Sequence, residues 1–289
     1  MVQIMTDTVA QLTEKVALEH GIKIVPAATI YCDGKTFIDG VDITSTEAYE
    51  LLAQNPKQFN TAAMPQHYIT EILKQVGARE KEIFYITLSS KISVVHDVVV
   101  MASQEAMGKV TGLTIRVFDS LSASGGEGLI ALAAAKAAAK GLDFHEIAEV
   151  AFKARQEAEC LFVFETLADT YRSGRIPRIG ARAADVLGVK PLCRIHQDGK
   201  VHAAGLARSR AKGIQRMLDM TRERVGEKPI NVIIGHTASP EAAEDLKTQV
   251  ENEFNCRDIF VSEFSPVMGY ATGPGILGIS SCPDFDIPV

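Results

Sequence analysis

The sequence has no tryptophan, no Cys-x-x-Cys pair and no apolar run of the ~18 residues that a membrane-spanning helix needs. Its five cysteines are dispersed and odd in number, which indicates free thiols in a reducing cytoplasm. Its seven histidines show no ligand-like spacing, so we expect no metal site. The first residues lack a basic segment followed by an apolar core, and no signal peptide is expected.

An excess of basic residues is also missing. The 30 lysines and arginines are outnumbered by 36 aspartates and glutamates, which gives a net charge of −6 and argues against a nucleic-acid partner. An apolar content of 46% with 23% charged residues is typical of a soluble globular protein. The 289 residues are enough for about two domains of ordinary size.

Three common catalytic or nucleotide-binding patterns are absent as well. No G-x-G-x-x-G follows the first strand, and no G-x-x-x-x-G-K-[ST] occurs, so the usual backbone cradles for nucleotide phosphates are missing. Ser122-Ala123-Ser124-Gly125 lies in a strand-to-helix turn but lacks the leading glycine of G-x-S-x-G. A serine nucleophile would need a histidine base, and a sequence alone does not place one beside any of these serines.

Hydroxyl side chains gather where predicted strands end. The apolar run Ile83–Thr87 predicts a buried strand; Ser89, Ser90 and Ser93 follow it, and a helix is expected over 94–107. Ligands in open α/β sheets bind at such strand ends, and a helix N-terminus favours an anion. Ser93 therefore has two interpretations, an N-cap or a ligand contact. A second polar strand end follows Thr114–Asp119, before a helix over 126–140.

The order of elements predicts an α/β protein of two domains. Residues 1–155 alternate strands and helices and predict a doubly wound, mainly parallel sheet, with a strand over 22–28 and a loop over 60–65. Residues 156–289 predict a mixed α/β domain, because Asp198-Gly199 indicates a hairpin. A helix is expected over 166–171. Asp7, Asp39 and Asp42 could form an acidic cluster for a cation, but turn and cap roles are favoured.

Several motifs in order along the chain resemble the DegV family, bacterial fatty-acid-binding proteins that carry acyl chains to a fatty acid kinase. Three similar strand-end motifs are Thr6-Asp7-Thr8, Ser89-Ser90-Lys91-Ile92-Ser93 and Asp119-Ser120-Leu121-Ser122-Ala123-Ser124. Asp39-Gly40-Val41-Asp42-Ile43-Thr44 matches the family's D-G-V-D-I-T without change. Four later segments are similar as well: Ser173-Gly174-Arg175-Ile176, Gly188-Val189-Lys190-Pro191-Leu192, Arg208-Ser209-Arg210 and Thr272-Gly273-Pro274-Gly275.

The resemblance implies that a long-chain fatty acid lies in a buried tunnel and that the protein presents its carboxylate to the kinase without catalysing a reaction. The N-terminal domain would hold the head group, and the C-terminal domain would hold the acyl chain and the partner surface. The carboxylate would bind Ser93 and Thr61, with Ser124 nearby. The resemblance implies no cofactor besides the fatty acid. A cytoplasmic monomer that exchanges lipid transiently with the membrane is expected.

The chain departs from the family at the head group. Alanine replaces a threonine at Ala62, unless the loop shifts so that Thr61 serves, and it replaces a histidine at Ala271. His96, Tyr270 or Arg172 could compensate. One alternative is therefore a lipid with a different head group.

A second alternative is a serine hydrolase using Ser93 or Ser124 with a histidine such as His96. In the family, arginines like Arg208 and Arg210 contact the kinase; the competing interpretation is a solvated helix start.

Overall fold

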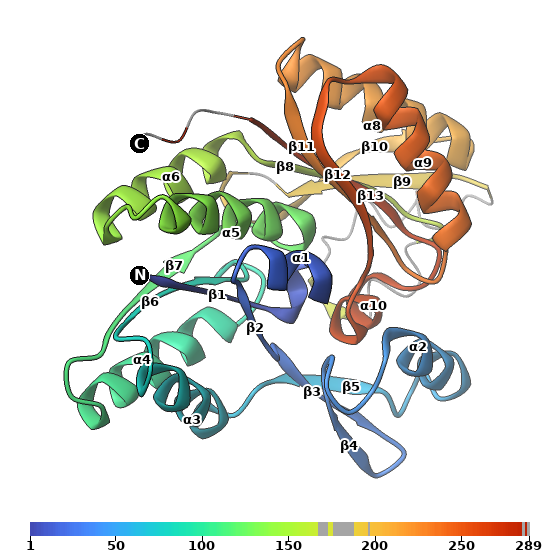
Figure 1. Cartoon of the computed structure of the whole chain (residues 1–289). Coiled ribbons are helices and arrows are strands. Elements are labelled where there is room, and N and C mark those ends of the chain that lie inside the picture. The colour runs from blue at the N-terminus through green and yellow to red at the C-terminus, as the bar shows by residue number, and fades with distance from the viewer. Residues whose placement is uncertain (167–172, 176–187, 196, 285–286, 288–289) are drawn as a thin grey trace.

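We describe a computed structural model of the chain, which covers residues 1–166, 173–175, 188–195, 197–284 and 287. The expected helix over 166–171 and Arg172 therefore lie outside the described residues, apart from Thr166. Two sheets are stacked with helix α5 (Ser124–Ala139) between them, and a small third sheet lies below (Figure 1). The α/β class predicted from the sequence is confirmed.

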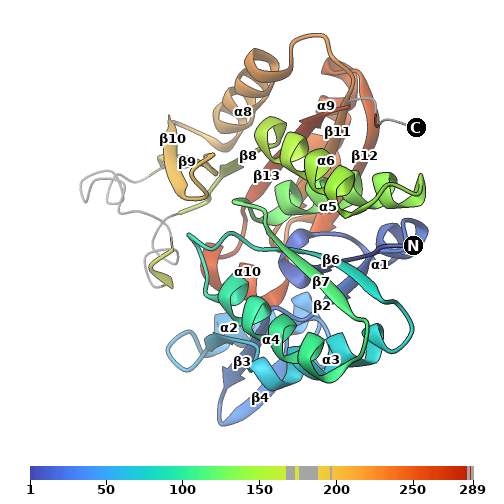
Figure 2. The ribbon, with the colours of Figure 1, turned by 90° about the vertical axis from the view of Figure 1, so that its left-hand side faces the viewer.

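The first sheet is four-stranded and entirely parallel, in the order β2-β1-β6-β7. Its strands are β1 (Gln3–Asp7), β2 (Lys23–Val25), β6 (Glu82–Thr87) and β7 (Thr114–Asp119). The segments next to these strands in the sequence contain four helices. They are the 3-10 helix η1 (Thr8–Ala10) and helices α1 (Glu14–Glu19), α3 (Gln66–Gly77) and α4 (Val95–Lys109). Helices α3 and α4 pack together on one face, and α5 covers the other (Figure 2). The parallel sheet was predicted from the alternation of elements.

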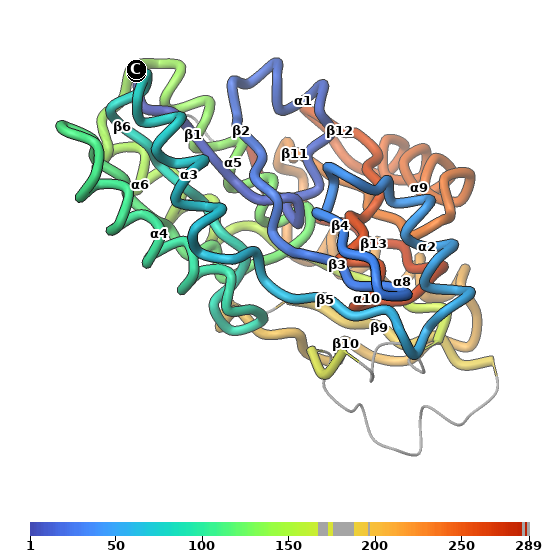
Figure 3. Tube along the Cα trace, turned by 90° about the horizontal axis from the view of Figure 1, so that it is seen from below, coloured from blue at the N-terminus to red at the C-terminus, as the bar shows by residue number. Residues whose placement is uncertain are grey.

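The expected strand over 22–28 is wrong in one respect, because the chain changes sheets at Pro26 and Ala27. Beyond them, β3 (Ala28–Cys32) pairs antiparallel with β4 (Lys35–Ile38) and with β5 (Asn60–Ala63). The expected loop over 60–65 is therefore wrong, since most of it forms β5. Helix α2 (Ser45–Gln54) packs against this sheet, and Thr44 and Glu47 form a capping box at its start (Figure 3).

The second sheet is six-stranded and mixed, in the order β10-β9-β8-β13-β11-β12. Its strands are β8 (Glu159–Val163), β9 (Lys190–Ile195), β10 (Val201–Ala207), β11 (Ile230–His236), β12 (Cys256–Glu263) and β13 (Leu277–Pro283). Helices α6 (Phe144–Glu157), α8 (Arg210–Val225), α9 (Pro240–Glu253) and α10 (Pro266–Thr272) complete the chain. The predicted antiparallel β9–β10 hairpin is confirmed. Sequence patterns missed β13 and α10.

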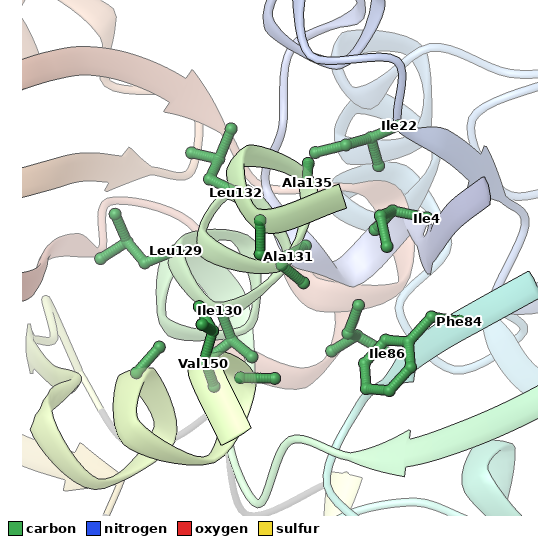
Figure 4. Close-up of a cluster of buried hydrophobic side chains, with 14 of the residues drawn as sticks. Ile4, Ile22, Phe84, Ile86, Leu129, Ile130, Ala131, Leu132, Ala135 and Val150 are labelled. Carbon is green, nitrogen blue, oxygen red and sulfur yellow. The ribbon is translucent and has the colours of Figure 1, made fainter. Parts of the chain in front are cut away.

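Helix α5 is the centre of the molecule, and 13 of its 16 residues are buried. Ile4, Phe84 and Ile86 of the first sheet point toward it, while Leu129 and Leu132 lie on its other side (Figure 4). The alanines let the helix pack on both sheets and on α6, because their small side chains permit close approach. The second sheet begins at β8, but α5 contacts both sheets, so the division at 155/156 stays a prediction.

No helix within the described ranges is long and apolar enough to cross a membrane. All five cysteines are free thiols, and four of them are buried.

Candidate ligand-binding site

The strand order of the first sheet reverses between β1 and β6, and in open α/β sheets the crevice at such a point is the usual ligand site. Here a buried carboxylate fills it. Asp7 accepts hydrogen bonds from the backbone N–H groups of Val9 at 2.9 Å and Leu88 at 3.1 Å. The two backbone N–H groups at this point are thus already bonded to Asp7.

A second buried acid, Glu127, lies near this point. Burial raises the pKa of Asp7 to about 6, and burial together with the Asp7 charge raises the pKa of Glu127 well above its ordinary range. Glu127 is fully buried, and its Oε1 accepts from the Thr6 hydroxyl at 3.0 Å. Among the described residues no group of three or more potential ligands could hold a metal ion. Asp7 therefore has a structural role: it binds the backbone N–H groups of Val9 and Leu88.

Asp39 and Asp42 also have structural roles. Asp42 accepts from the Ile38 N–H at 3.0 Å, as expected of a turn residue. Asp39 is fully buried and accepts from the Thr8 hydroxyl and, at 3.1 Å, from the N–H of Val267 in the first turn of α10. Burial raises the pKa of Asp39 to about 6. This aspartate fixes α10 against the N-terminal half of the chain.

In the loop from Ser89 to Ser93, the first serine is fixed by hydrogen bonds and the last has a hydroxyl hydrogen available for donation. Ser89 is buried; its hydroxyl donates to the Gly199 carbonyl at 2.8 Å and accepts from the Lys91 N–H at 3.1 Å. Ser93 is half-buried, and its Oγ accepts from the Val95 N–H at 3.3 Å. The N-cap position belongs to Val94, so the capping prediction is one residue off. The Ser93 hydroxyl keeps its own hydrogen to donate.

Ser124 is fully buried and has a partner of its own. Its hydroxyl donates to Gln11 Oε1, which also accepts from the Gly125 N–H at 3.0 Å, and Gln11 Nε2 donates to the Ser262 carbonyl at 3.1 Å. Gln11 thus connects the N-terminal segment, the start of α5 and the second sheet. Its left-handed backbone, with φ of 55°, gives no signal in the sequence, and sequence patterns did not identify it.

The hydrogen-bond partner of His96 is Thr87, and the partner of Ser93 is Val95. The His96 Nδ1 lies 2.8 Å from the Thr87 hydroxyl, which comes from the end of β6. In the part of the chain that the structure describes, neither Ser93 nor Ser124 forms a hydrogen bond with a histidine. A hydrolase would need such a pair within reach of the nucleophile.

The register of β5 decides which way Thr61 and Ala62 face. Thr61 is opposite Ile30, and Ala62 is opposite Thr29. Residues opposite one another in a sheet share a face, so Thr61 lies on the same side as Ile30. Ile30 belongs to an apolar cluster against which Tyr270 of α10 packs. Ala62 is exposed on the other side.

Helix α10 carries the other predicted position, Ala271. This residue is half-buried, and its carbonyl accepts from the Ser173 hydroxyl at 3.3 Å. Beside it, Val267 and Met268 pack into the same apolar cluster as Ala63 of β5 and Val95 of α4. The elements that carry Thr61, Ser93 and Ala271 therefore meet at one cluster.

This cluster is continuous with the interior of the second sheet. Ile195 and Met268 also pack against a second cluster, which includes Phe162, Phe164 and Phe264. A seam beside Ala63 and Val95 is too narrow to hold a water molecule. An acyl chain can enter there only if the side chains separate.

Arg208 and Arg210 lie away from this cluster, where β10 leads into α8. Arg208 is exposed, while Arg210 is half-buried as the first residue of α8. Within the described residues, Nε and Nη2 of Arg210 are buried without a hydrogen-bond partner. Ser209, between them, caps the helix through the Lys212 N–H.

Comparison with known proteins places this architecture among relatives. A sequence model of the DegV family, described as uncharacterised proteins, matches residues 1–284. A DegV domain-containing protein of Streptomyces coelicolor is 29% identical over 280 residues, covering 96% of this chain and 97% of that protein.

Solved structures with the same fold are described as lipid binders. One, described as fatty-acid binding of a DegV family protein from Thermus thermophilus, has a TM-score of 0.89 at 23% identity and covers 98% of this chain and 99% of its own. A stearic-acid-binding protein from Eubacterium ventriosum also has a TM-score of 0.89, at 21% identity, with 98% of each chain covered. At these identities the likeness shows the fold.

Proposed function

Because the chain belongs to the DegV family, we propose that it binds a long-chain fatty acid and presents the carboxylate to a separate fatty acid kinase. The observation that carries this proposal is the meeting of β5, the loop before α4, and α10 at one apolar cluster. Polar groups at the edge of such a cluster suit a ligand with a polar head and an apolar tail. The protein itself does no chemistry in this proposal.

Ser93 is the central head-group contact in this proposal. Its Oγ is positioned by the Val95 N–H, which leaves the hydroxyl hydrogen for a carboxylate oxygen. The N-terminus of α4 adds a partial positive charge, which stabilises an anion there. Thr61 supplies a second hydroxyl on the face toward α10.

The acyl chain would follow the two apolar clusters joined by Ile195 and Met268. This path leads from the head group in the N-terminal half into the interior of the second sheet. Burying a methylene contributes about 0.8 kcal/mol, so a chain of sixteen or so carbons supplies ample binding free energy even with few polar contacts. A fatty acid therefore stays the preferred ligand in this proposal, although alanine occupies positions 62 and 271.

The partner surface would include Arg208, which is exposed, and Arg210 beside it. Guanidinium groups pair well with carboxylates and phosphates of a protein partner, which suits docking to a phosphoryl-transfer enzyme. We expect a cytoplasmic monomer that exchanges its lipid at the membrane.

Mass spectrometry of the protein under native conditions, after expression in a bacterial host, tests the proposal. We expect an additional mass equal to one acyl chain, which denaturation releases and gas chromatography identifies. A fresh preparation without lipid that also fails to bind added oleate and palmitate would contradict it. Binding of acyl alcohols or esters in place of acids would identify a different head-group class, as the alanines at 62 and 271 suggest.

A further inference from the structure

The tip of the β9–β10 hairpin, residues 197–200, lies against the loop that carries Ser93. Hairpin turns are usually exposed, and the neighbours of Gly199 on both sides are, but Gly199 itself is buried. Its carbonyl accepts the hydroxyl of Ser89, the first residue of the loop, at 2.8 Å. The second half of the chain therefore contacts the proposed head-group loop directly.

Position 199 favours glycine for two reasons. Its φ is 79°, in the left-handed region that side chains rarely adopt. A Cβ there would also lie 2.6 Å from Ser89 Oγ, 2.9 Å from Leu121 Cδ2 and 3.1 Å from Lys91 Cγ, so a methyl group would displace Ser89. Gly34, at the tip of the β3–β4 hairpin, has a similar φ of 72°, but among the described residues no atom lies within 4 Å of its Cβ position.

Ser89 connects this contact to Ser93. Its carbonyl accepts the backbone N–H groups of Ile92 at 3.0 Å and of Ser93 at 3.1 Å, which closes the loop into a turn. Ser89 thus bonds to Gly199 through its hydroxyl and to the Ser93 backbone through its carbonyl. A displacement of Ser89 therefore moves Ser93, and hydrogen bonds weaken steeply when their geometry is lost.

The same hairpin also reaches the proposed path of the acyl chain. Ile195, at the end of β9, packs against both apolar clusters, and Val201, at the start of β10, packs against the second. One element of the second sheet thus contacts both the proposed tail path and the loop that would hold the carboxylate.

We propose that Gly199 is a positioning residue for the head group, which acts through Ser89 to fix the Ser93 hydroxyl where a carboxylate oxygen meets it. Gly199 does not touch the ligand in this proposal. The inference rests on the proposed fatty-acid binding at Ser93, and it adds that the second half of the chain completes the head-group site.

A double-mutant cycle on the delipidated full-length protein tests this, with displacement of a fluorescent fatty acid as the readout. We expect Gly199→Ala to raise the dissociation constant for palmitate about three- to tenfold. In the Ser93→Ala background the same change should raise it less than about twofold, because the group that Gly199 positions is gone. An equal loss in both backgrounds would overturn the proposal, since a general loosening of the fold acts without the Ser93 hydroxyl.

Gly34→Ala is the matched control, because it places the same side chain at another Asp-Gly hairpin turn of similar φ without the contact to Ser89. Its affinity for palmitate should stay at the wild-type value, and a loss equal to that of Gly199→Ala would overturn the proposal. If Gly199→Ala does not fold, Ser89→Ala removes the link without adding an atom. Its effect should likewise disappear in the Ser93→Ala background.

Amide hydrogen exchange of the ligand-free protein distinguishes failure of this inference from failure of the proposed function. Gly199→Ala should speed exchange of the Ser93 N–H about tenfold or more relative to Gly34→Ala, because the Ser89 carbonyl that accepts it is displaced. Unchanged exchange at Ser93 would overturn the positioning role whether or not a fatty acid binds. Wild-type protein that binds no fatty acid would contradict the proposed function instead.

Discussion

Asp7 Oδ2 accepts the N–H of Leu88 at 3.1 Å and thereby joins the carboxyl end of β1 to that of β6. Leu88 is followed at once by the loop that carries Ser93. The buried carboxylate at the switch point of the sheet thus positions the proposed head-group contact from behind. Ionisation of the Asp7 carboxyl is unfavourable because this side chain is fully buried, and its pKa is therefore raised to about 6.

Asp7 makes stability depend on pH. Its pKa in the folded protein lies about two units above the ordinary value, so the folded state binds more protons between pH 4 and 6. Stability from this group therefore falls as the pH rises through that window, by about 3 kcal/mol. Urea unfolding of Asp7→Asn should show a correspondingly shallower decline from pH 4 to 7 than the wild type. Parallel pH profiles would contradict this assignment.

Ser93→Ala should weaken fatty-acid binding. The change removes one hydrogen bond to a charged group, which contributes about 1.5–3 kcal/mol, so the dissociation constant should rise about 10- to 100-fold. Displacement of a fluorescent fatty acid from delipidated protein measures it.

Ser90→Ala is the matched control in the same loop. Ser90 bonds through its backbone N–H to Asp119 at 3.2 Å, an interaction that alanine retains. Its affinity should stay at the wild-type value, and equal losses in the two variants would indicate a general loosening of the loop instead of a contact by Ser93.

The same loop shows how far sequence patterns reach. The β6 strand, its serines and the following helix were predictable, because the apolar run and the helical spacing are local signals. Strand β5 was not, because Asn60–Ala63 is short and becomes a strand only through pairing with β3, some 30 residues away. That pairing in turn decides which of Thr61 and Ala62 faces α10.

Long-range contacts explain why sequence patterns also missed helix α10 and the role of Gln11. Helix α10 is seven residues long, and Asp39, far away in sequence, fixes its first turn. Gln11 precedes α1 in the sequence, and only the fold brings it to Ser124 and Ser262. The family resemblance predicts Ser93 and Thr61 as head-group contacts, whereas such links between distant segments have no sequence signature of their own.

Gln11→Met should destabilise the protein. Methionine has a similar volume but leaves the Ser124 hydroxyl and the Gly125 N–H without their acceptor in a buried place. We expect a loss of about 2–4 kcal/mol, because each buried unsatisfied group costs about 1–3 kcal/mol. Gln54→Met, at the exposed end of α2, is the control and should change the unfolding free energy by less than about 0.5 kcal/mol. Equal unfolding free energies of the two variants in urea would show that the Gln11 amide contributes nothing.

Arg208→Glu should impair use of the bound fatty acid without impairing binding. Arg208 is exposed and lies outside the cluster at Ser93, so the affinity for fatty acid should be unchanged. Reversing the charge should raise the protein concentration needed for half-maximal phosphorylation by a fatty acid kinase, by about tenfold or more. Arg216→Glu, on the same helix as Arg210, is the control for net charge. An equal effect of both changes would indicate general electrostatic attraction in place of a docking contact.

Two glycines in helices should respond to alanine with opposite signs. Gly108 lies in α4, and no atom lies within 4 Å of the position that a Cβ would take, so Gly108→Ala should stabilise the protein by about 0.5–1 kcal/mol through the reduced entropy of the unfolded chain. Gly126 lies in the first turn of α5, where a Cβ would overlap the Cys160 sulfur of β8 and the Ser122 hydroxyl, both buried. Alanine is preferred over glycine in this helix too, but overpacking costs about 1–3 kcal/mol, which exceeds the gain from that preference. Gly126→Ala should therefore destabilise the protein. Urea unfolding of both variants measures the two signs, and stabilisation by Gly126→Ala would show that α5 does not pack on β8 as closely as described.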